Sequence, residues 1–224
     1  GFARAAASLL QLARVDEDGR VTWPRCTLRD APSFGFRAFM VDMGRNPHRK
    51  ATLMRIVDAM WLFKLRYLQL HLIDDQLSSW PSEAFPKLRQ ERAGWTLDDY
   101  RALEAYASAR GITIIPEIEV PGHSTILRRE YPEVFGKNPT ELARSPEAQR
   151  GVETLISECL EVFRSSPYVH VGGDEAYGVP QDLQRDFINR LNRFVRSLGK
   201  RTIVWEGPRL GVGERGRRAE LGGD

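Results

Sequence analysis

The feature that most constrains the fold of this chain is a regular alternation of short apolar runs with longer segments of helical period. The apolar runs are rich in β-branched and aromatic residues and are predicted as strands at 36–41, 67–73, 112–118, 168–171 and 202–205. The segments between them repeat apolar residues at three- and four-residue spacing, which is typical of amphipathic helices. Strands that alternate with helices form parallel sheets joined by right-handed crossovers. The sequence therefore predicts an α/β fold.

Local signals mark the ends of the predicted helices. One helix is expected at 50–64, and Thr96 is expected to cap a second helix that ends before Gly111. Ser145 begins a third helix with an apolar stripe, and Gly199 ends a fourth. These signals agree with the strand positions, so each predicted strand is separated from the next by at least one helix.

Two architectures have this alternation, the doubly wound sheet and the (β/α)8 barrel. The first predicted strand is not followed by the GxGxxG turn that marks the commonest doubly wound sheets. Polar residues instead follow every strand, as they do where a barrel builds its active site. They are Asp42 and Arg45, then Asp74, Asp75 and Gln76, then Glu117, Glu119 and His123, then Asp174 and Glu175, and last Glu206. We therefore predict a TIM-type (β/α)8 barrel that is incomplete, with about five of its eight β/α units visible.

The composition is that of an ordinary globular protein, with 42% hydrophobic and 28% charged residues. No apolar run approaches the roughly 20 residues of a membrane span, and the opening segment lacks the form of a signal peptide. We expect a soluble protein of undetermined compartment and oligomeric state. Basic residues are interspersed with acidic ones, which argues against a nucleic-acid partner. The distant Cys26 and Cys159 have no metal-binding spacing, and no metal or other cofactor is expected.

The sequence HVGGDE at 170–175 places two acids at the end of a short strand, after two glycines. Neighbouring carboxyl groups repel when both are ionised, and a buried site separates their pKa values into one ionised and one protonated acid. Asp174 and Glu175 are therefore candidates for acid–base chemistry. A glycine turn that carries a solvated acid is the alternative, and the motif alone does not decide between them.

Together with three other motifs, this segment resembles the catalytic domain of glycoside hydrolase family 20, the β-N-acetylhexosaminidases. The motifs are FRAFMVDMGR at 36–45, HLIDDQ at 71–76 with FPKL at 85–88, PEIEVPGH at 116–123, and HVGGDE itself. The resemblance extends from LLQL at 9–12 to Trp205 and Glu206. It implies that 1–30 is the tail of a preceding α+β domain with its linker and that 31–210 is a partial catalytic barrel, while 211–224 is predicted as an irregular tail.

The resemblance implies hydrolysis of terminal N-acetylhexosamine glycosides, in which the acetamido oxygen of the substrate acts as the nucleophile. Glu175 would then be the general acid and base, and Asp174 would hold the acetamido N–H. The resemblance also implies sugar contacts for Arg37 and an acetamido-pocket wall at Trp205, and it pairs Asp74 with His123 behind the acid. His71, Asp75, His170 and Glu119 are expected to support the site, and members of the family are often exported or lysosomal.

Three positions differ from the family pattern, which has glycine at Ala38, asparagine at Arg66 and aspartate at Glu119. Two alternatives to a complete enzyme stay open. An incomplete barrel exposes sheet edges, so the chain is also interpreted as an inactive or merely carbohydrate-binding fragment of such an enzyme. A metal-dependent barrel hydrolase using the strand-end histidines and aspartates is less favoured, because no HxH or HExxH spacing occurs.

Overall fold

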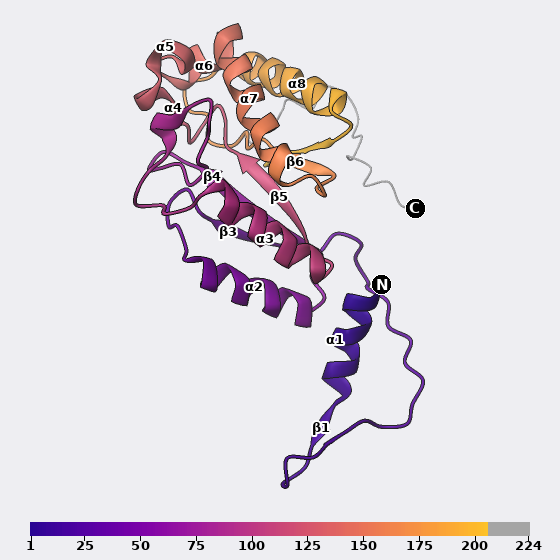
Figure 1. The fold of residues 1–224 in the computed structure, drawn as a ribbon. Coiled ribbons are helices and arrows are strands. Elements are labelled where there is room, and N and C mark those ends of the chain that lie inside the picture. The colour runs from indigo at the N-terminus through magenta and orange to yellow at the C-terminus, as the bar shows by residue number, and fades with distance from the viewer. Residues whose placement is uncertain (206–224) are drawn as a thin grey trace, which may run out of the picture.

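The computed structural model describes residues 1–205, so the predicted tail at 211–224 lies outside the described residues, and so does Glu206. The elements follow one another as strands and helices in regular succession (Figure 1). They are α1 (Phe2–Leu12), β1 (Arg14–Val15), β2 (Val21–Thr22), β3 (Ala38–Asp42), α2 (Lys50–Leu62), β4 (Tyr67–Ile73), a short 3-10 helix (Pro86–Leu88), α3 (Leu97–Ala109), β5 (Thr113–Ile118), α4 (Thr125–Glu130), α5 (Pro132–Phe135), α6 (Pro139–Arg144), α7 (Pro146–Val162), β6 (Tyr168–His170), α8 (Gln181–Ser197) and β7 (Arg201–Ile203).

The main sheet has five parallel strands in the order β3-β4-β5-β6-β7. The spatial order equals the chain order and never reverses. A doubly wound sheet reverses its strand order at a switch point. When each new strand is instead added on the same side of the previous one, right-handed crossovers place every helix on one face of the sheet, as in a barrel. The sheet is therefore of the barrel type, and the prediction of an α/β fold is confirmed.

The helices form one layer on the outside of the sheet. Successive helices contact each other, α2 with α3, α3 with α7, and α7 with α8. Strand β4 lies between β3 and β5 and is buried along its whole length. Its leucines at 68, 70 and 72 alternate with Gln69 and His71, which share the opposite face.

Capping residues begin two of these helices as the sequence predicts. The Thr96 side chain accepts a hydrogen bond from the Asp99 N–H, and the Asp99 side chain accepts one from the Thr96 N–H, which completes a capping box. The Ser145 side chain accepts hydrogen bonds from the N–H groups of residues 147 and 148 at the start of α7. The α4, α5 and α6 helices lie between β5 and α7 and were not predicted individually.

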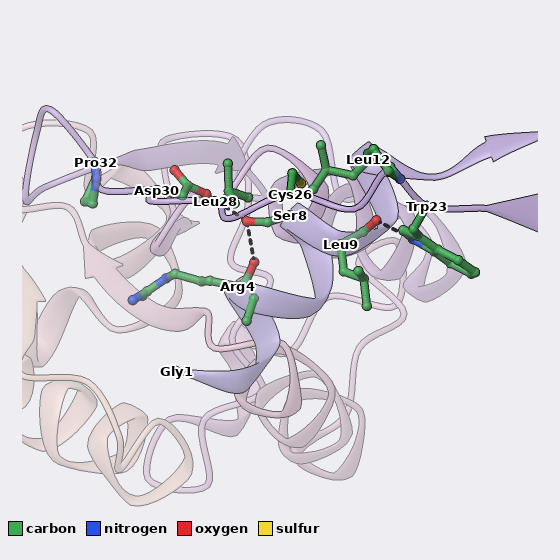
Figure 2. Close-up of a pocket in the computed structure, with 12 residues that line it drawn as sticks. Gly1, Arg4, Ser8, Leu9, Leu12, Trp23, Cys26, Leu28, Asp30 and Pro32 are labelled. Carbon is green, nitrogen blue, oxygen red and sulfur yellow. Dashed lines mark hydrogen bonds between the residues drawn. The ribbon is translucent and has the colours of Figure 1, made fainter.

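The first 30 residues form a small arm whose helix α1 contacts α2 and whose hairpin projects away from the sheet (Figure 1). Helix α1 precedes a two-stranded antiparallel hairpin of β1 and β2. The segment after the hairpin runs back along α1, where the Ser8 hydroxyl donates to Asp30 at 2.7 Å and Trp23 Nε1 donates to the Leu9 carbonyl at 2.9 Å. The groove of about 570 Å³ between them is lined by residues of this arm (Figure 2).

Candidate active site

Most of the predicted site residues gather at the carboxyl ends of the five strands. Asp42 ends β3, and acidic or imidazole side chains follow β4, β5 and β6 within a few residues. There they surround a cavity of about 250 Å³. Its lining consists of Met40, Arg45, His71, Glu119, His123, Asp174 and Trp205.

Four neighbouring strands place a polar residue at the same level of the sheet. Asp42 on β3 lies opposite His71 on β4, His71 lies opposite Glu117 on β5, and Glu117 lies opposite His170 on β6. Residues that lie directly opposite one another point to the same face of a sheet. We call Asp42, His71, Glu117 and His170 the polar row; of these four residues, His71 lines the cavity.

Glu117 is the buried centre of the polar row. Its carboxylate accepts hydrogen bonds from Gln69 Nε2 at 2.8 Å and from Trp205 Nε1 at 2.7 Å. One of its oxygens lies 3.2 Å from His71 Nδ1 and 3.3 Å from His170 Nδ1. Burial alone would raise the pKa of Glu117, but the contact with His71 and the hydrogen bond from Gln69 lower it, so the group is ionised.

The two histidines of the polar row carry different charges. Burial opposes a charge on His71, but Asp74 at 2.7 Å from Nε2 and Glu117 on the other side raise its pKa to about 10. Burial lowers the pKa of His170, whose Nδ1 accepts a hydrogen bond from the Gly172 N–H at 3.1 Å. His71 is therefore an imidazolium between two carboxylates, and His170 is neutral.

A second line of contacts runs from the polar row to Glu175. Arg45 Nη1 donates to Asp42 Oδ2 at 2.8 Å, and Arg45 Nη2 lies 2.7 Å from Asp74 Oδ2 and 3.3 Å from His123 Nδ1. His123 Nε2 in turn lies 3.1 Å from Glu175 Oε2. His123 Nδ1 thus faces Arg45 and Asp74, and its Nε2 faces Glu175. The histidine thereby connects Glu175 to an ion-pair network that contains the fully buried Asp74.

The backbone carries strain at both ends of that last contact. His123 has φ 44° and Glu175 has φ 42°, values that side chains other than glycine seldom adopt. Glu175 was expected to be buried beside Asp174, but its side chain is 54% exposed and its partner is His123. Asp174 is the more enclosed acid, and its buried Oδ1 has no hydrogen-bond partner among residues 1–205.

Glu119 differs from the other acids of the site. Burial, followed by the negative charges of Asp174 and Glu117, raises its pKa to about 10. Its Oε1 accepts the Gly173 N–H at 2.9 Å. Glu119 is therefore a neutral carboxylic acid at neutral pH, next to the ionised Glu117.

The remaining predicted residues lie in different places. Trp205 covers the polar row, with its ring centroid 4.6 Å from that of His170. Asp75 lies at the rim, where it accepts the Thr125 N–H at 2.9 Å. Asp74 Oδ1 is 3.5 Å from His123 Nδ1, so these two residues are close together as expected.

Arg37 is the exception, because the structure does not bring it into the cavity. It precedes β3 at the amino end of the sheet, and its side chain donates to the carbonyls of Lys64 at 3.0 Å and Phe34 at 2.5 Å. The strand separates it from Asp42, which lies at the carboxyl end. The expectation that Arg37 lines the sugar pocket is corrected for this structure, because its guanidinium is held by loop carbonyls at the wrong end of the strand.

Sequence reasoning gave too little weight to Arg45 and Glu117 and overlooked Gln69 and Gln184. Gln69 and His71 alternate with leucines in a strand that is otherwise apolar, and this period of two marks a polar inner face. That signal was available. Gln184 lies on α8, and only the packing of α8 against the 172–175 turn shows its importance.

Within residues 1–205, three groups of histidine and carboxylate side chains lie close enough to hold a metal ion, and each contains His71 or Asp74. The donor atoms of both residues are already engaged. Asp74 contacts His71, the cationic Arg45 and the Asp75 N–H, while His71 is held between two acids. A guanidinium and an imidazolium in the cluster supply the positive charge that a metal would otherwise bring. The geometry therefore supports an ion-pair network more than a metal centre.

A one-directional parallel sheet with carboxylates at successive strand ends is the arrangement of a TIM-type barrel domain whose site lies at the carboxyl ends of its strands. The model described as the catalytic domain of glycosyl hydrolase family 20 matches residues 34–179, which include both acids of the 170–175 motif. The chain belongs to this family and contains part of its catalytic barrel.

Known members of the family resemble this chain over most of its length. A beta-hexosaminidase of Vibrio furnissii is 27% identical over 260 residues, which cover 92% of this chain and 42% of the relative. A beta-hexosaminidase of Akkermansia muciniphila is 34% identical over 181 residues, covering 68% and 36% respectively. This chain therefore spans less than half the length of these curated relatives.

Solved structures show the same fold. The beta-N-acetylhexosaminidase of Bacteroides fragilis superposes with a TM-score of 0.83 at 26% identity, covering 92% of this chain and 47% of that one. The exo beta-N-acetylglucosaminidase of Vibrio harveyi in complex with N-acetylglucosamine gives 0.79 at 26% identity, covering 92% and 41%. The five parallel strands are thus a part of a TIM barrel. No helix among residues 1–205 is both long and apolar enough to span a membrane.

Proposed function

We propose that this chain carries the catalytic acids of a β-N-acetylhexosaminidase, which removes terminal N-acetylhexosamine from glycosides with retention of configuration. The observation that carries the proposal is the 3.1 Å contact of Glu175 Oε2 with His123 Nε2, which connects Glu175 to the ion pair of Arg45 and Asp74. A carboxyl group that is half exposed and is held in place by a neighbouring histidine can donate a proton to a leaving-group oxygen and later activate a water molecule. Family membership and the relatives' printed activities support this assignment.

In this proposal, Asp174 and Glu175 have separate tasks. The buried Oδ1 of Asp174 has no hydrogen-bond partner among the described residues, so it is free to accept the acetamido N–H of the substrate. The acetamido oxygen then attacks the anomeric carbon, and the leaving-group oxygen takes the proton of Glu175. The cyclic oxazolinium that forms is opened by a water molecule, which Glu175 deprotonates. An internal nucleophile has a high effective concentration, which accounts for a site without a separate enzymatic nucleophile.

The test is hydrolysis of 4-nitrophenyl N-acetyl-β-glucosaminide by the 224-residue chain. Whatever nitrophenol release this chain gives should fall by about 10²-fold or more in Glu175→Gln and stay unchanged in the surface control Glu147→Gln. The first sugar product, followed by NMR, should be the β-anomer. Release that is unaffected by Glu175→Gln, or that is abolished by a chelator, would contradict the proposal.

A second candidate function, sugar binding without turnover, is favoured by the exposed edges of the sheet. Phe39 and Met40 on β3 are 47% and 37% exposed, and Val204 after β7 is 38% exposed. Such apolar surface costs stability, so we expect low stability and little turnover from these 224 residues alone. Binding of N-acetylglucosamine without hydrolysis supports this candidate, whereas hydrolysis that depends on Glu175 rules it out.

A further inference from the structure

The peptide groups on either side of Gly173 are held by two buried side chains from different elements. Glu119, which follows β5, accepts the Gly173 N–H at 2.9 Å. Gln184, on α8, donates from Nε2 to the Gly173 carbonyl. Glu119 is fully buried and Gln184 is 8% exposed. The carbonyl that Gln184 holds belongs to the peptide bond leading directly to Asp174.

The preceding Gly172 is held just as closely. Its N–H donates to His170 Nδ1 at 3.1 Å, and its carbonyl accepts the Trp205 N–H at 2.9 Å. A β-carbon at Gly172 would lie between 1.8 and 2.2 Å from the carboxyl atoms of Glu119. The carboxyl group of Glu119 thus fills the space that a side chain at this position would need.

We propose that Glu119 and Gln184 are positioning residues. Glu119 holds the N–H of Gly173 and Gln184 holds its carbonyl, and together these hydrogen bonds fix the position of Asp174 relative to the substrate. This inference rests on the proposed function, because it assumes that Asp174 receives the acetamido group. It adds two residues that do not touch the sugar themselves. Both contact the backbone of Gly173 rather than a side chain, so they set the backbone conformation from which the Asp174 side chain projects.

The protonation state of Glu119 suits this task. A second negative charge at this place would repel the ionised Glu117 and compete with Asp174 for positive partners. Burial and these neighbouring acids raise the pKa of Glu119 to about 10, so the group accepts the Gly173 N–H as a neutral acid. An amide has nearly the same shape and the same acceptor oxygen. Glutamine should therefore replace Glu119 without loss, whereas alanine should not.

Glu119 also lines the cavity, so direct participation in the reaction is the competing role. A catalytic carboxyl group must exchange a proton, and glutamine cannot do so. Glu119→Gln thus separates the two roles: it keeps activity if Glu119 positions the turn and loses it if Glu119 transfers protons.

The experiment compares Glu119→Gln, Glu119→Ala and Gln184→Leu with the 224-residue chain, using Gln181→Leu on the exposed side of α8 as the matched control. The first readout is the amide proton of Gly173 in nitrogen-15 NMR spectra. Its shift should be retained in Glu119→Gln and move upfield in Glu119→Ala. The second readout is the affinity for N-acetylglucosamine, which should weaken about tenfold in Glu119→Ala and Gln184→Leu. Thermal melts identify any variant that fails to fold.

Where the chain hydrolyses the nitrophenyl substrate, kcat should fall on the order of 10²-fold in Glu119→Ala and Gln184→Leu, with Glu119→Gln within about twofold of the unmodified chain. A Glu119→Gln variant as impaired as Glu119→Ala would overturn the proposal. So would an unchanged Gly173 amide in Glu119→Ala, or equal affinities in Gln184→Leu and Gln181→Leu. The shift of the Gly173 amide proton tests the hydrogen bond from Gly173 to Glu119 even if the chain hydrolyses nothing. A failure of the positioning proposal can therefore be distinguished from a failure of the proposed function.

Discussion

Replacement of Gly172 by alanine is the sharpest test of how the acid-bearing turn is built. Gly172 has φ +68°, a region that costs an L-residue about 1–2 kcal/mol. The new β-carbon would also lie within 1.8–2.2 Å of the Glu119 carboxyl group, and excess volume in a packed core costs about 1–3 kcal/mol. Together these give a loss of about 2–5 kcal/mol, a large share of the 5–15 kcal/mol that stabilises a typical domain.

Gly178 offers a matched control in the same loop. It has φ +81°, and a β-carbon there would meet nothing within 4 Å. Gly178→Ala should therefore lose only the conformational part, about 1–2 kcal/mol. The free energy of unfolding is measured by urea denaturation followed by circular dichroism, with equal denaturant slopes required for the comparison.

A third variant tests whether the greater loss of stability in Gly172→Ala than in Gly178→Ala comes from the collision with the Glu119 carboxyl group. Removing the carboxyl group by Glu119→Ala gives the alanine at position 172 room, so the double variant should recover about 1 kcal/mol or more relative to the sum of the single losses. Equal losses in Gly172→Ala and Gly178→Ala, or strict additivity with Glu119→Ala, would refute the reasoning, because the predicted collision would then have no energetic effect.

Three further predictions concern stability. The folded chain holds protons on His71 and Glu119 with pKa values of about 10, above the ordinary 6.5 and 4.5. Unfolding above the ordinary pKa of each group releases its proton, so stability should fall with rising pH between about 4.5 and 10 for Glu119 and between about 6.5 and 10 for His71, by up to about 1.4 kcal/mol per pH unit for each proton. A slope in urea melts that Glu119→Gln does not flatten would contradict this. Thr96→Ala removes the capping box and should cost about 1 kcal/mol in the same assay. Trp205→Phe leaves Glu117 without its indole donor and should cost about 1–3 kcal/mol, while Trp23→Phe in the N-terminal arm should cost less.

The order of strands and helices was predictable because each element carries its own local pattern. The strand at 67–73 has the predicted bounds, and the helix expected at 50–64 ends only two residues early, at Leu62. Choosing a barrel over a doubly wound sheet was also within reach, since polar residues follow every strand. The short helices between β5 and α7 were missed because four- to six-residue helices show too little periodicity to be recognised.

The contacts within the site could be predicted only in part. Asp74, His123 and Glu175 are recognisable as polar residues at strand ends. The grip of Gln184 on Gly173 depends instead on how α8 packs against a turn eleven residues earlier in the chain. The position of Arg37 depends on loop carbonyls that no local pattern reveals. Interactions of this kind arise from tertiary packing, so the sequence shows their residue types but not their partners.

The polar row limits where a chain of this kind can change in length. Side chains alternate along a strand, so one residue inserted in β5 before Glu117 would turn this carboxylate toward the helices and present its apolar neighbour to His71 and His170. An insertion between β5 and α7, in the stretch that holds the three short helices, leaves the phase of every strand unchanged. We therefore expect related chains to differ in length within the connections and to keep β3 to β6 constant. Engineering of this scaffold should follow the same rule, with new segments placed in loops and never within a strand.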